Sequence, residues 1–177
     1  MIAAVVLAAG QSLRMGRPKP LLRFSDDRTF LGQIVSVLGR SRVDRITVVL
    51  GAEADGILAS IDLSGVDVVI NHDYRKGQLS SLIAALSRVP AEVEAVVLCL
   101  ADNPFITPEI VDRLVGAFRE TGKPIVVPVY DGKRGHPALF ARTVFQELIT
   151  APADQGARHV LHEHAAGHEA FDHEHKR

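Results

Sequence analysis

The chain has 177 residues, which suits one domain and leaves too few residues for two hydrophobic cores. Apolar residues make up 47% of it and charged residues 23%, as in a folded globular protein, so a disordered chain is not expected. The 20 basic and 21 acidic side chains nearly cancel, which argues against a protein that coats nucleic acid.

Five uninterrupted apolar runs predict strands that are buried on both faces of a sheet. They cover residues 2–7, 46–50, 66–70, 95–100 and 125–127. The first run, even when extended to residue 9, is too short to span a bilayer, and no basic residue precedes it as in a signal peptide. We therefore expect a cytoplasmic protein that does not bind a membrane.

A helix is predicted in each gap between these strands, and three of the four rest on the helical spacing of apolar residues or on capping signals. The helices are expected at residues 30–38, 52–60, 79–86 and 108–121. The last of them follows Thr107, a suitable N-cap residue, has Pro108 at its first position, and is closed by Gly122.

The repeated order of strand, helix and strand predicts an α/β fold: a three-layer sandwich in which a mostly parallel sheet carries helices on both faces. Ligands of such sheets bind beyond the carboxyl ends of the strands. No linker or internal repeat is visible, so we expect one domain over residues 1–166 and a charged, His-rich tail over residues 167–177.

The loop after the first predicted strand combines a glycine with three basic residues, Arg14, Arg17 and Lys19. Gly10 lets backbone N–H groups approach a phosphate because no Cβ stands in the way, and the basic side chains supply positive charge. Five residues separate Gly10 from Gly16 and Arg17 takes the place of the lysine, so the loop is not a Walker A motif. It is not a dinucleotide fingerprint either, because Gln11–Ser12 lacks the second glycine. An ordinary turn with solvated basic residues is the alternative interpretation.

Asp102 ends the fourth predicted strand, at the edge of the sheet where ligands are expected. A carboxylate there either binds a cation or caps the turn before Pro104. Mg²⁺ is typically held by one or two carboxylates together with phosphate oxygens, so this one Asp is enough to propose a magnesium site. The single Cys99 excludes an internal disulfide and a cysteine-based zinc site, and inside an apolar strand it is expected to be a core residue.

The segment 7–19 resembles the signature L-A-[AG]-G-x-S-x-R-M-G-x-x-K of the MobA-like nucleotidyltransferases and matches every fixed position of it. Residues 71–82 and 100–104 resemble the N-x-x-[YW]-x-x-G-x-x-S-S-L and L-x-D-x-P segments of the molybdenum-cofactor cytidylyltransferase branch. The segments G-H-P-A-L-F at 135–140 and D-Q-G-A-R at 154–158 agree with the same family. The resemblance covers residues 1 to about 166 in the family's order.

The resemblance implies a Rossmann-like nucleotidyltransferase fold and a role for each matching residue. Arg14 and Lys19 would neutralise the triphosphate, and Asp102 would bind Mg²⁺. His136 would contact the acceptor, although the residues alone allow a plain turn histidine equally well. The nucleotide-binding set that the family implies consists of Leu7, Ala8, Ala9, Gly10, Asn71, Gly77, Ser80 and Ser81. Ser80 and Ser81 could instead cap the following helix.

The function implied by the resemblance is Mg²⁺-dependent transfer of a nucleoside monophosphate to a phosphorylated acceptor such as molybdopterin, with release of pyrophosphate and a possible molybdoenzyme partner. Ala9 and the pair Pro18–Lys19 match cytidylyl rather than guanylyl members, which favours CTP. A phosphate monoester is largely dianionic at neutral pH, so the attack needs no general base. The alternatives are an enzyme that uses GTP or a sugar- or alcohol-phosphate acceptor, and a nucleotide-binding accessory protein without catalysis.

The C-terminal segment departs from the family pattern, which continues into a further strand and an acidic D-x-D-T-P-E-D-like segment with a second metal ligand. Here that acidic segment is not found, and Asp172 does not stand in a matching context. We expect an open sheet edge beyond residue 166 that another subunit could cover. Six of the eight histidines lie from His159 onward; His159 and His162 would share a helix face and could bind a metal, but neighbouring charged residues favour a solvated end.

Overall fold

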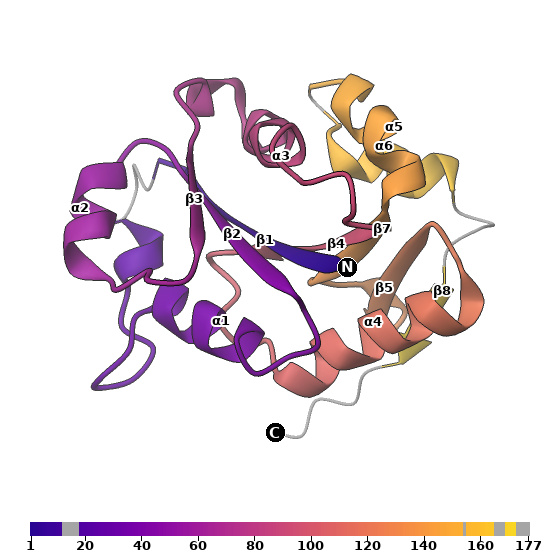
Figure 1. Ribbon diagram of the computed structural model, residues 1–177, viewed down its shortest axis with the longest axis horizontal. Helices are drawn as coiled ribbons and strands as arrows, with labels where there is room; N and C mark the ends of the chain where they lie inside the picture. The colour runs from indigo at the N-terminus through magenta and orange to yellow at the C-terminus, as the bar shows by residue number, and fades with distance from the viewer. Residues whose placement is uncertain (12–17, 154, 165–168, 173–177) are drawn as a thin grey trace.

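The structure is a computed structural model that describes residues 1–11, 18–153, 155–164 and 169–172, with backbone only for the last range. It contains one eight-stranded sheet in the order β3-β2-β1-β4-β7-β5-β6, with β8 paired to β5 (Figure 1). Six strands point the same way: β1 (Ile2–Ala8), β2 (Arg45–Leu50), β3 (Asp67–Ile70), β4 (Ala95–Leu100), β5 (Ile125–Tyr130) and β8 (Glu169–Asp172). The antiparallel strands are β6 (Lys133–Arg134) and β7 (Ala138–Ala141).

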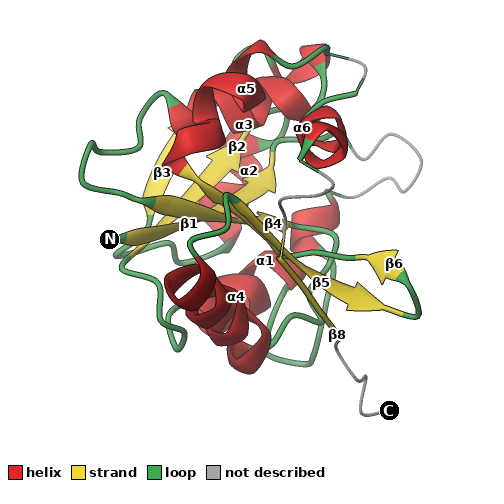
Figure 2. Cartoon of the chain, turned by 90° about the vertical axis from the view of Figure 1, so that its right-hand side faces the viewer, coloured by secondary structure: helices red, strands yellow, loops and turns green. Residues whose placement is uncertain are grey.

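Helices cover both faces of the sheet (Figure 2). One layer holds α1 (Phe30–Leu38), α2 (Ala54–Ser60) and α4 (Pro108–Thr121), and the other holds α3 (Gln78–Leu86), α5 (Phe145–Thr150) and α6 (Ala157–Glu163). Three short 3-10 helices are η1 (Lys19–Leu21), η2 (Tyr74–Lys76) and η3 (Arg142–Val144). In the described part of the chain, no helix is long and apolar enough to cross a membrane.

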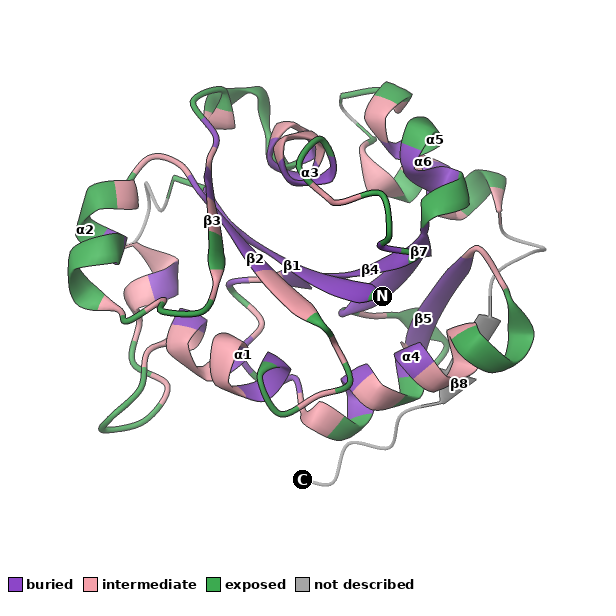
Figure 3. Cartoon of the chain, in the orientation of Figure 1, coloured by how far each residue is buried: buried purple, intermediate pink, exposed green. Residues whose placement is uncertain are grey.

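The central strands are apolar without interruption because side chains on both faces are buried (Figure 3). Along β1, Val6 and its alternate neighbours pack toward α1 and α4, whereas Val5 and Leu7 pack toward α3 and α5. A strand buried on both faces reads as a continuous apolar run, and the predicted three-layer α/β sandwich is confirmed.

The path of the chain beyond β4 differs from a simple repeat of parallel strands. The antiparallel strand β7 lies between β4 and β5, with Leu98 opposite Ala138 and Val126 opposite Leu139. The next strand along the chain, β5, is therefore not the spatial neighbour of β4. The sequence interpretation missed β7 and the hairpin partner β6.

The edge strand β8 changes the interpretation of the C-terminal segment. Its backbone pairs in parallel with β5, from Val126 opposite Glu169 to Val129 opposite Asp172. The expectation of an open edge beyond residue 166 was therefore wrong: a strand from the segment assigned to the tail pairs with that edge of β5. The domain boundary itself stays a prediction.

Candidate functional site

A cavity of about 370 Å³ opens at the carboxyl edge of the sheet, where β1 and β4 end. We call it the first cavity. Its walls come from the loop after β1, from η1, from the segment that joins η2 to α3, and from the residues after β4. The predicted site residues that line it are Leu7, Ala8, Ala9, Gly10, Lys19, Gly77, Ser81 and Asp102.

Lys19 and Asp102 meet inside this cavity although 83 residues separate them in the sequence. The Lys19 Nζ lies 3.2 Å from the Asp102 Oδ2, and the two side chains are 45% and 50% exposed. Such a half-exposed pair contributes at most about 1 kcal/mol because water screens it. Both groups can therefore exchange this contact for a charged ligand at little cost.

The structure does not show Asp102 in the alternative role of a cap, either for the turn before Pro104 or for the helix α4 that follows. The N-cap of α4 is Thr107, whose hydroxyl accepts from the Ile110 N–H at 3.4 Å. Within the described residues, no backbone N–H donates to the Asp102 carboxylate, and no group of three or more His, Cys, Asp or Glu side chains gathers as a metal site. A single accessible carboxylate beside a cavity fits Mg²⁺ that takes its remaining ligands from phosphate and water.

Asn71 is buried, and its side chain forms hydrogen bonds to other residues of the protein. Its Nδ2 donates to the Ser80 Oγ at 2.9 Å and to the Ser81 Oγ at 3.0 Å, and its Oδ1 accepts from the Asp73 N–H at 2.9 Å. Asn71 and Ser80 do not line the first cavity, whereas Ser81 and Gly77 do. Asn71 thus ties the end of β3 to the first turn of α3 and positions the wall of the cavity.

Ser80 and Ser81 lie inside the first turn of α3 rather than at its cap. The N-cap is Gly77, which has a φ of 97° and a ψ of −179° and provides no side-chain hydrogen bond. This backbone conformation is open to glycine and strained for other residues. Gly77 therefore allows the chain to turn sharply into α3, and it lines the first cavity at this turn.

Tyr74 and Gln78 also line the first cavity, and sequence reasoning gave neither of them a role. Both stand in the segment 71–82 that carried the family resemblance, so the aromatic position of that motif was the available signal. Gly51, which follows β2, packs against Tyr74 and Ala9 and holds this side of the wall in place.

His136 lies beside a second cavity of about 410 Å³ that shares Leu7, Gln78 and Leu100 with the first. Burial of the imidazole among protein atoms lowers the pKa of His136 from its ordinary 6.5. A hydrogen bond with the Leu98 backbone and the charge of Asp102 oppose that shift. The ring is therefore mostly neutral at pH 7, and the cavities that border it give water partial access.

The predicted cation Arg14 lies outside the described residues, as do Arg17, Asp154 and the histidines of the last five positions. The described histidines near the C-terminus include His164, whose Nε2 lies 2.7 Å from the Glu147 Oε2.

The curated relatives that this chain resembles have more than one activity. It is 29% identical over 161 residues to the molybdenum cofactor cytidylyltransferase of Escherichia coli, covering 90% of this chain and 80% of the relative. It is 33% identical over 162 residues to a probable molybdenum cofactor guanylyltransferase of Mycobacterium avium, covering 89% and 77%. It is also 28% identical over 172 residues to nicotine blue oxidoreductase of Paenarthrobacter nicotinovorans, covering 90% and 81%.

Comparisons with solved structures and with a family model agree with these sequence similarities. A crystal structure of Rv0371c from Mycobacterium tuberculosis has a TM-score of 0.87 and 34% identity, covering 97% of this chain and 87% of that one. The manganese complex of the same protein has a TM-score of 0.83 at 35% identity, with the same coverage. The family model described as the MobA-like NTP transferase domain matches residues 4–169. The chain therefore belongs to the MobA-like nucleotidyltransferases.

Proposed function

We propose that the protein is a Mg²⁺-dependent cytidylyltransferase of the cytoplasm that moves CMP from CTP onto a phosphorylated acceptor such as molybdopterin. The observation that carries this proposal is the meeting of Lys19 and Asp102, 3.2 Å apart, in a cavity that residues 7–10 also line. A cation, a carboxylate and peptide groups close to a glycine form the set that a metal-bound polyphosphate requires.

Each group has a distinct task in this proposal. The Lys19 ammonium binds the triphosphate as a point charge, and the N–H groups around Gly10 approach its oxygens. The family resemblance adds Arg14 as a second cation. Asp102 would hold Mg²⁺, which when bound neutralises charge on the phosphate oxygens.

The reaction joins two phosphates without a protein nucleophile. An oxygen of the acceptor's phosphate attacks the α-phosphorus of CTP, a new P–O–P bond forms, and the bond from the α-phosphorus to the bridging oxygen breaks as pyrophosphate leaves. The attacking phosphate is already mostly ionised at neutral pH, so positioning and charge stabilisation supply the catalysis.

CTP is favoured over GTP because Ala9 stands where guanylyl members of the family have glycine. Ala9 is buried and lines the first cavity together with Tyr74. The relatives named above include both a cytidylyl- and a guanylyltransferase, so GTP is the alternative substrate. The second candidate function is a nucleotide-binding accessory protein, which is favoured because Asp102 is the only acidic side chain among the described residues that line the first cavity.

The experiment mixes the protein with each of the four ribonucleoside triphosphates, Mg²⁺ and molybdopterin, and measures pyrophosphate. Release that is fastest with CTP, that needs the acceptor, and that stops when EDTA removes Mg²⁺ is the expected result. Faster release with GTP would favour the alternative nucleotide. Tight CTP binding without any release would contradict catalysis and favour the accessory function.

A further inference from the structure

A pocket of about 200 Å³ opens at the amino end of the strands β1, β2 and β3. We call it the amino-edge pocket. Its floor is the face of these strands that packs toward α3, and the segment that follows α3 forms its wall. None of the described residues that line it also lines the first or the second cavity, so the pocket is separate from the proposed site of transfer. Its polar side chains are Arg45, Thr47, Asp67 and Arg88.

Thr47 places a hydroxyl group at the floor of this pocket. It stands two residues before Val49 on β2 and therefore shares the face that packs toward α3. Thr47 is only 8% exposed, and among the described residues no group forms a hydrogen bond with its hydroxyl. Every fully enclosed polar side-chain atom of the described residues has a partner, so the Thr47 hydroxyl is not enclosed and opens into the pocket. Because buried polar groups are normally hydrogen-bonded, this hydroxyl indicates a ligand atom or a water at the floor.

Arg88 brings a positive charge to the wall of the pocket. It follows the end of α3, and its side chain is exposed. Among the residues that the structure describes, no carboxylate oxygen lies within 4.0 Å of the Arg88 guanidinium. A guanidinium presents two parallel N–H groups that match the two oxygens of a carboxylate. Arg88 is therefore available to an anion in the pocket.

The other guanidinium of the pocket is already paired. The Arg45 Nε and Nη2 donate to the Asp67 Oδ2 at 3.0 Å and 2.7 Å, because the two residues begin the neighbouring strands β2 and β3. This pair has no net charge, which leaves the single positive charge of Arg88. The Asp67 carboxylate would also repel a second negative charge on a ligand. The pocket therefore fits a monoanion better than the phosphate dianion.

The remaining lining of the pocket is aliphatic. Ala3 and Val69 belong to the core on this face of the sheet, and Val89 packs against that core. An aliphatic group placed on these side chains is favoured because it leaves water, whereas the hydroxyl groups of a sugar would lose hydrogen bonds there. The pocket has about half the volume of the first cavity, 200 Å³ against 370 Å³, so it suits a short chain rather than a nucleotide.

We propose that the amino-edge pocket is a binding site for a small aliphatic monocarboxylate. The carboxylate binds the Arg88 guanidinium and accepts from the Thr47 hydroxyl, and the aliphatic chain lies on Ala3 and Val69. Thr47 and Arg88, to which sequence reasoning gave no role, are the residues that recognise the ligand. The inference does not depend on the proposed nucleotidyl transfer, because the pocket shares no lining residue with the first cavity.

The test is a ¹H–¹⁵N NMR titration of the full chain with three probes at constant pH and ionic strength. The probes are 3-methylbutanoate, its neutral amide 3-methylbutanamide, and inorganic phosphate. We expect 3-methylbutanoate to shift the amide signals of Thr47, Val69 and Val89 until they saturate. It should bind more tightly than either other probe, because only it combines a single negative charge with an aliphatic chain.

Three variants test the two assigned contacts. Arg88→Gln should bind 3-methylbutanoate about tenfold more weakly, as expected for the loss of a charged hydrogen bond. Thr47→Val keeps the shape of the side chain and should bind about fivefold more weakly, whereas Thr47→Ser keeps the hydroxyl and should retain the affinity. Urea unfolding should show no loss of stability in Thr47→Val, because the hydroxyl has no partner in the described fold. Arg134→Gln, on the exposed strand β6 and outside the pocket, is the matched control and should bind like the original chain.

Several outcomes would overturn the proposal. They are the absence of saturable shifts with 3-methylbutanoate, equal or tighter binding of the amide or of phosphate, and unchanged affinity in Arg88→Gln or Thr47→Val. Shifts at Gly10 and Gly77 in place of Thr47 would also overturn it, because the probe would then occupy the first cavity. No nucleotide is present in these titrations, so a failure of the proposed nucleotidyl transfer would leave their result unchanged.

Discussion

Gly51 packs so closely on Ala9 that a Cβ added to the glycine would lie 2.6 Å from the Ala9 carbonyl oxygen and 2.9 Å from its Cβ. The same added atom would lie 2.8 Å from the Cβ of Tyr74. The residue after β2 thus sets how closely two walls of the first cavity approach each other. Gly51 is not itself among the lining residues of the first cavity, yet it controls the shape of the proposed nucleotide site.

The Gly51→Ala variant should be less stable and bind CTP more weakly, because backbone and buried atoms cannot move away from the new methyl group. Overpacking of this kind costs about 1–3 kcal/mol of unfolding free energy. Urea unfolding and CTP titration measure the two effects. Gly56→Ala is the matched control, because a Cβ at this position of α2 meets nothing within 4 Å; it should bind CTP normally and be no less stable. Equal behaviour of the two variants would contradict the role of Gly51.

Removal of either charged group of the first cavity should abolish most of the turnover. We expect Lys19→Ala and Asp102→Ala each to lower the rate of pyrophosphate release by about 10²–10³, the effect typical of a lost transition-state contact. Both should stay folded, because their half-exposed ion pair contributes little to stability. Circular dichroism checks the fold, and Lys133→Ala on the exposed strand β6 is the control. Near-normal release by either site variant would refute the assigned roles.

The sequence predicted the first half of the fold well because β1, β2 and β4 are central strands. Their apolar runs continue without polar alternation, and burial on both faces leaves no other interpretation. The strand β7 was missed for the opposite reason: it has four residues, and its antiparallel place between β4 and β5 is decided by tertiary packing. The β5–β6 hairpin had a usable signal in Asp131–Gly132, whose φ values of 49° and 70° are typical of a two-residue turn.

The sequence predicted those site residues that stand at strand ends. It did not predict the contacts that side chains make with one another across the site. Residues 7–10 and Asp102 follow from the rule that ligands bind at the carboxyl edge. The meeting of Lys19 with Asp102 depends on how η1 crosses that edge, which no local pattern encodes. The internal hydrogen bonds of Asn71 likewise need the fold, because they join β3 to α3.

His136 should make the stability of the protein sensitive to mild acid. Burial lowers its pKa in the folded state below the ordinary 6.5, so the unfolded chain binds the proton more readily. The stability that neutral His136 contributes is therefore complete above the ordinary pKa and is lost as the pH falls toward the lowered value. Urea midpoints taken between about pH 7.5 and pH 5.5 should fall further for the original chain than for His136→Gln. If the urea midpoints of both proteins fell equally with pH, the His136 imidazole would not be the cause of the acid sensitivity.

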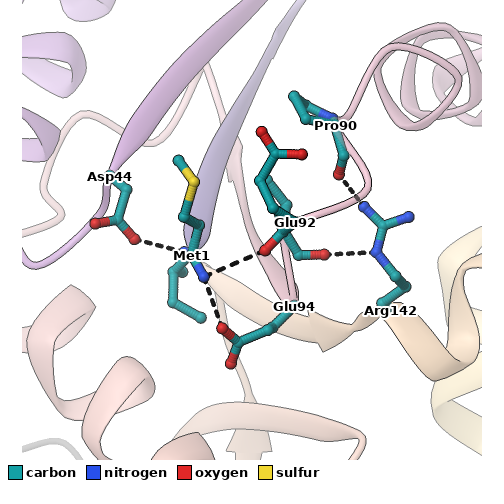
Figure 4. A network of polar contacts seen from close by, with 8 residues as sticks. Met1, Asp44, Pro90, Glu92, Glu94 and Arg142 are labelled. Carbon is teal, nitrogen blue, oxygen red and sulfur yellow. Dashed lines mark hydrogen bonds and ion pairs between the residues drawn. The ribbon is translucent and has the colours of Figure 1, made fainter.

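Arg142 lies near the amino end of β4, away from both cavities, and connects the segments there (Figure 4). Its Nε donates to the Val93 carbonyl at 2.5 Å, its Nη2 donates to the Pro90 carbonyl, and the guanidinium carbon lies 5.2 Å from the centre of the Phe145 ring. These contacts bind the loop before β4 to η3. We therefore regard Arg142 as a structural residue despite its charge.

The Arg142→Ala variant should lose about 2–3 kcal/mol of unfolding free energy, because two backbone carbonyls lose a charged donor. Arg142→Lys should recover part of that loss, since an ammonium can reach one carbonyl but lacks the planar fork. Urea unfolding measures both values, and CTP titration should give the same affinity for all three proteins. A stability loss accompanied by weaker CTP binding would mean that this edge is coupled to the nucleotide site, because neither cavity includes Arg142.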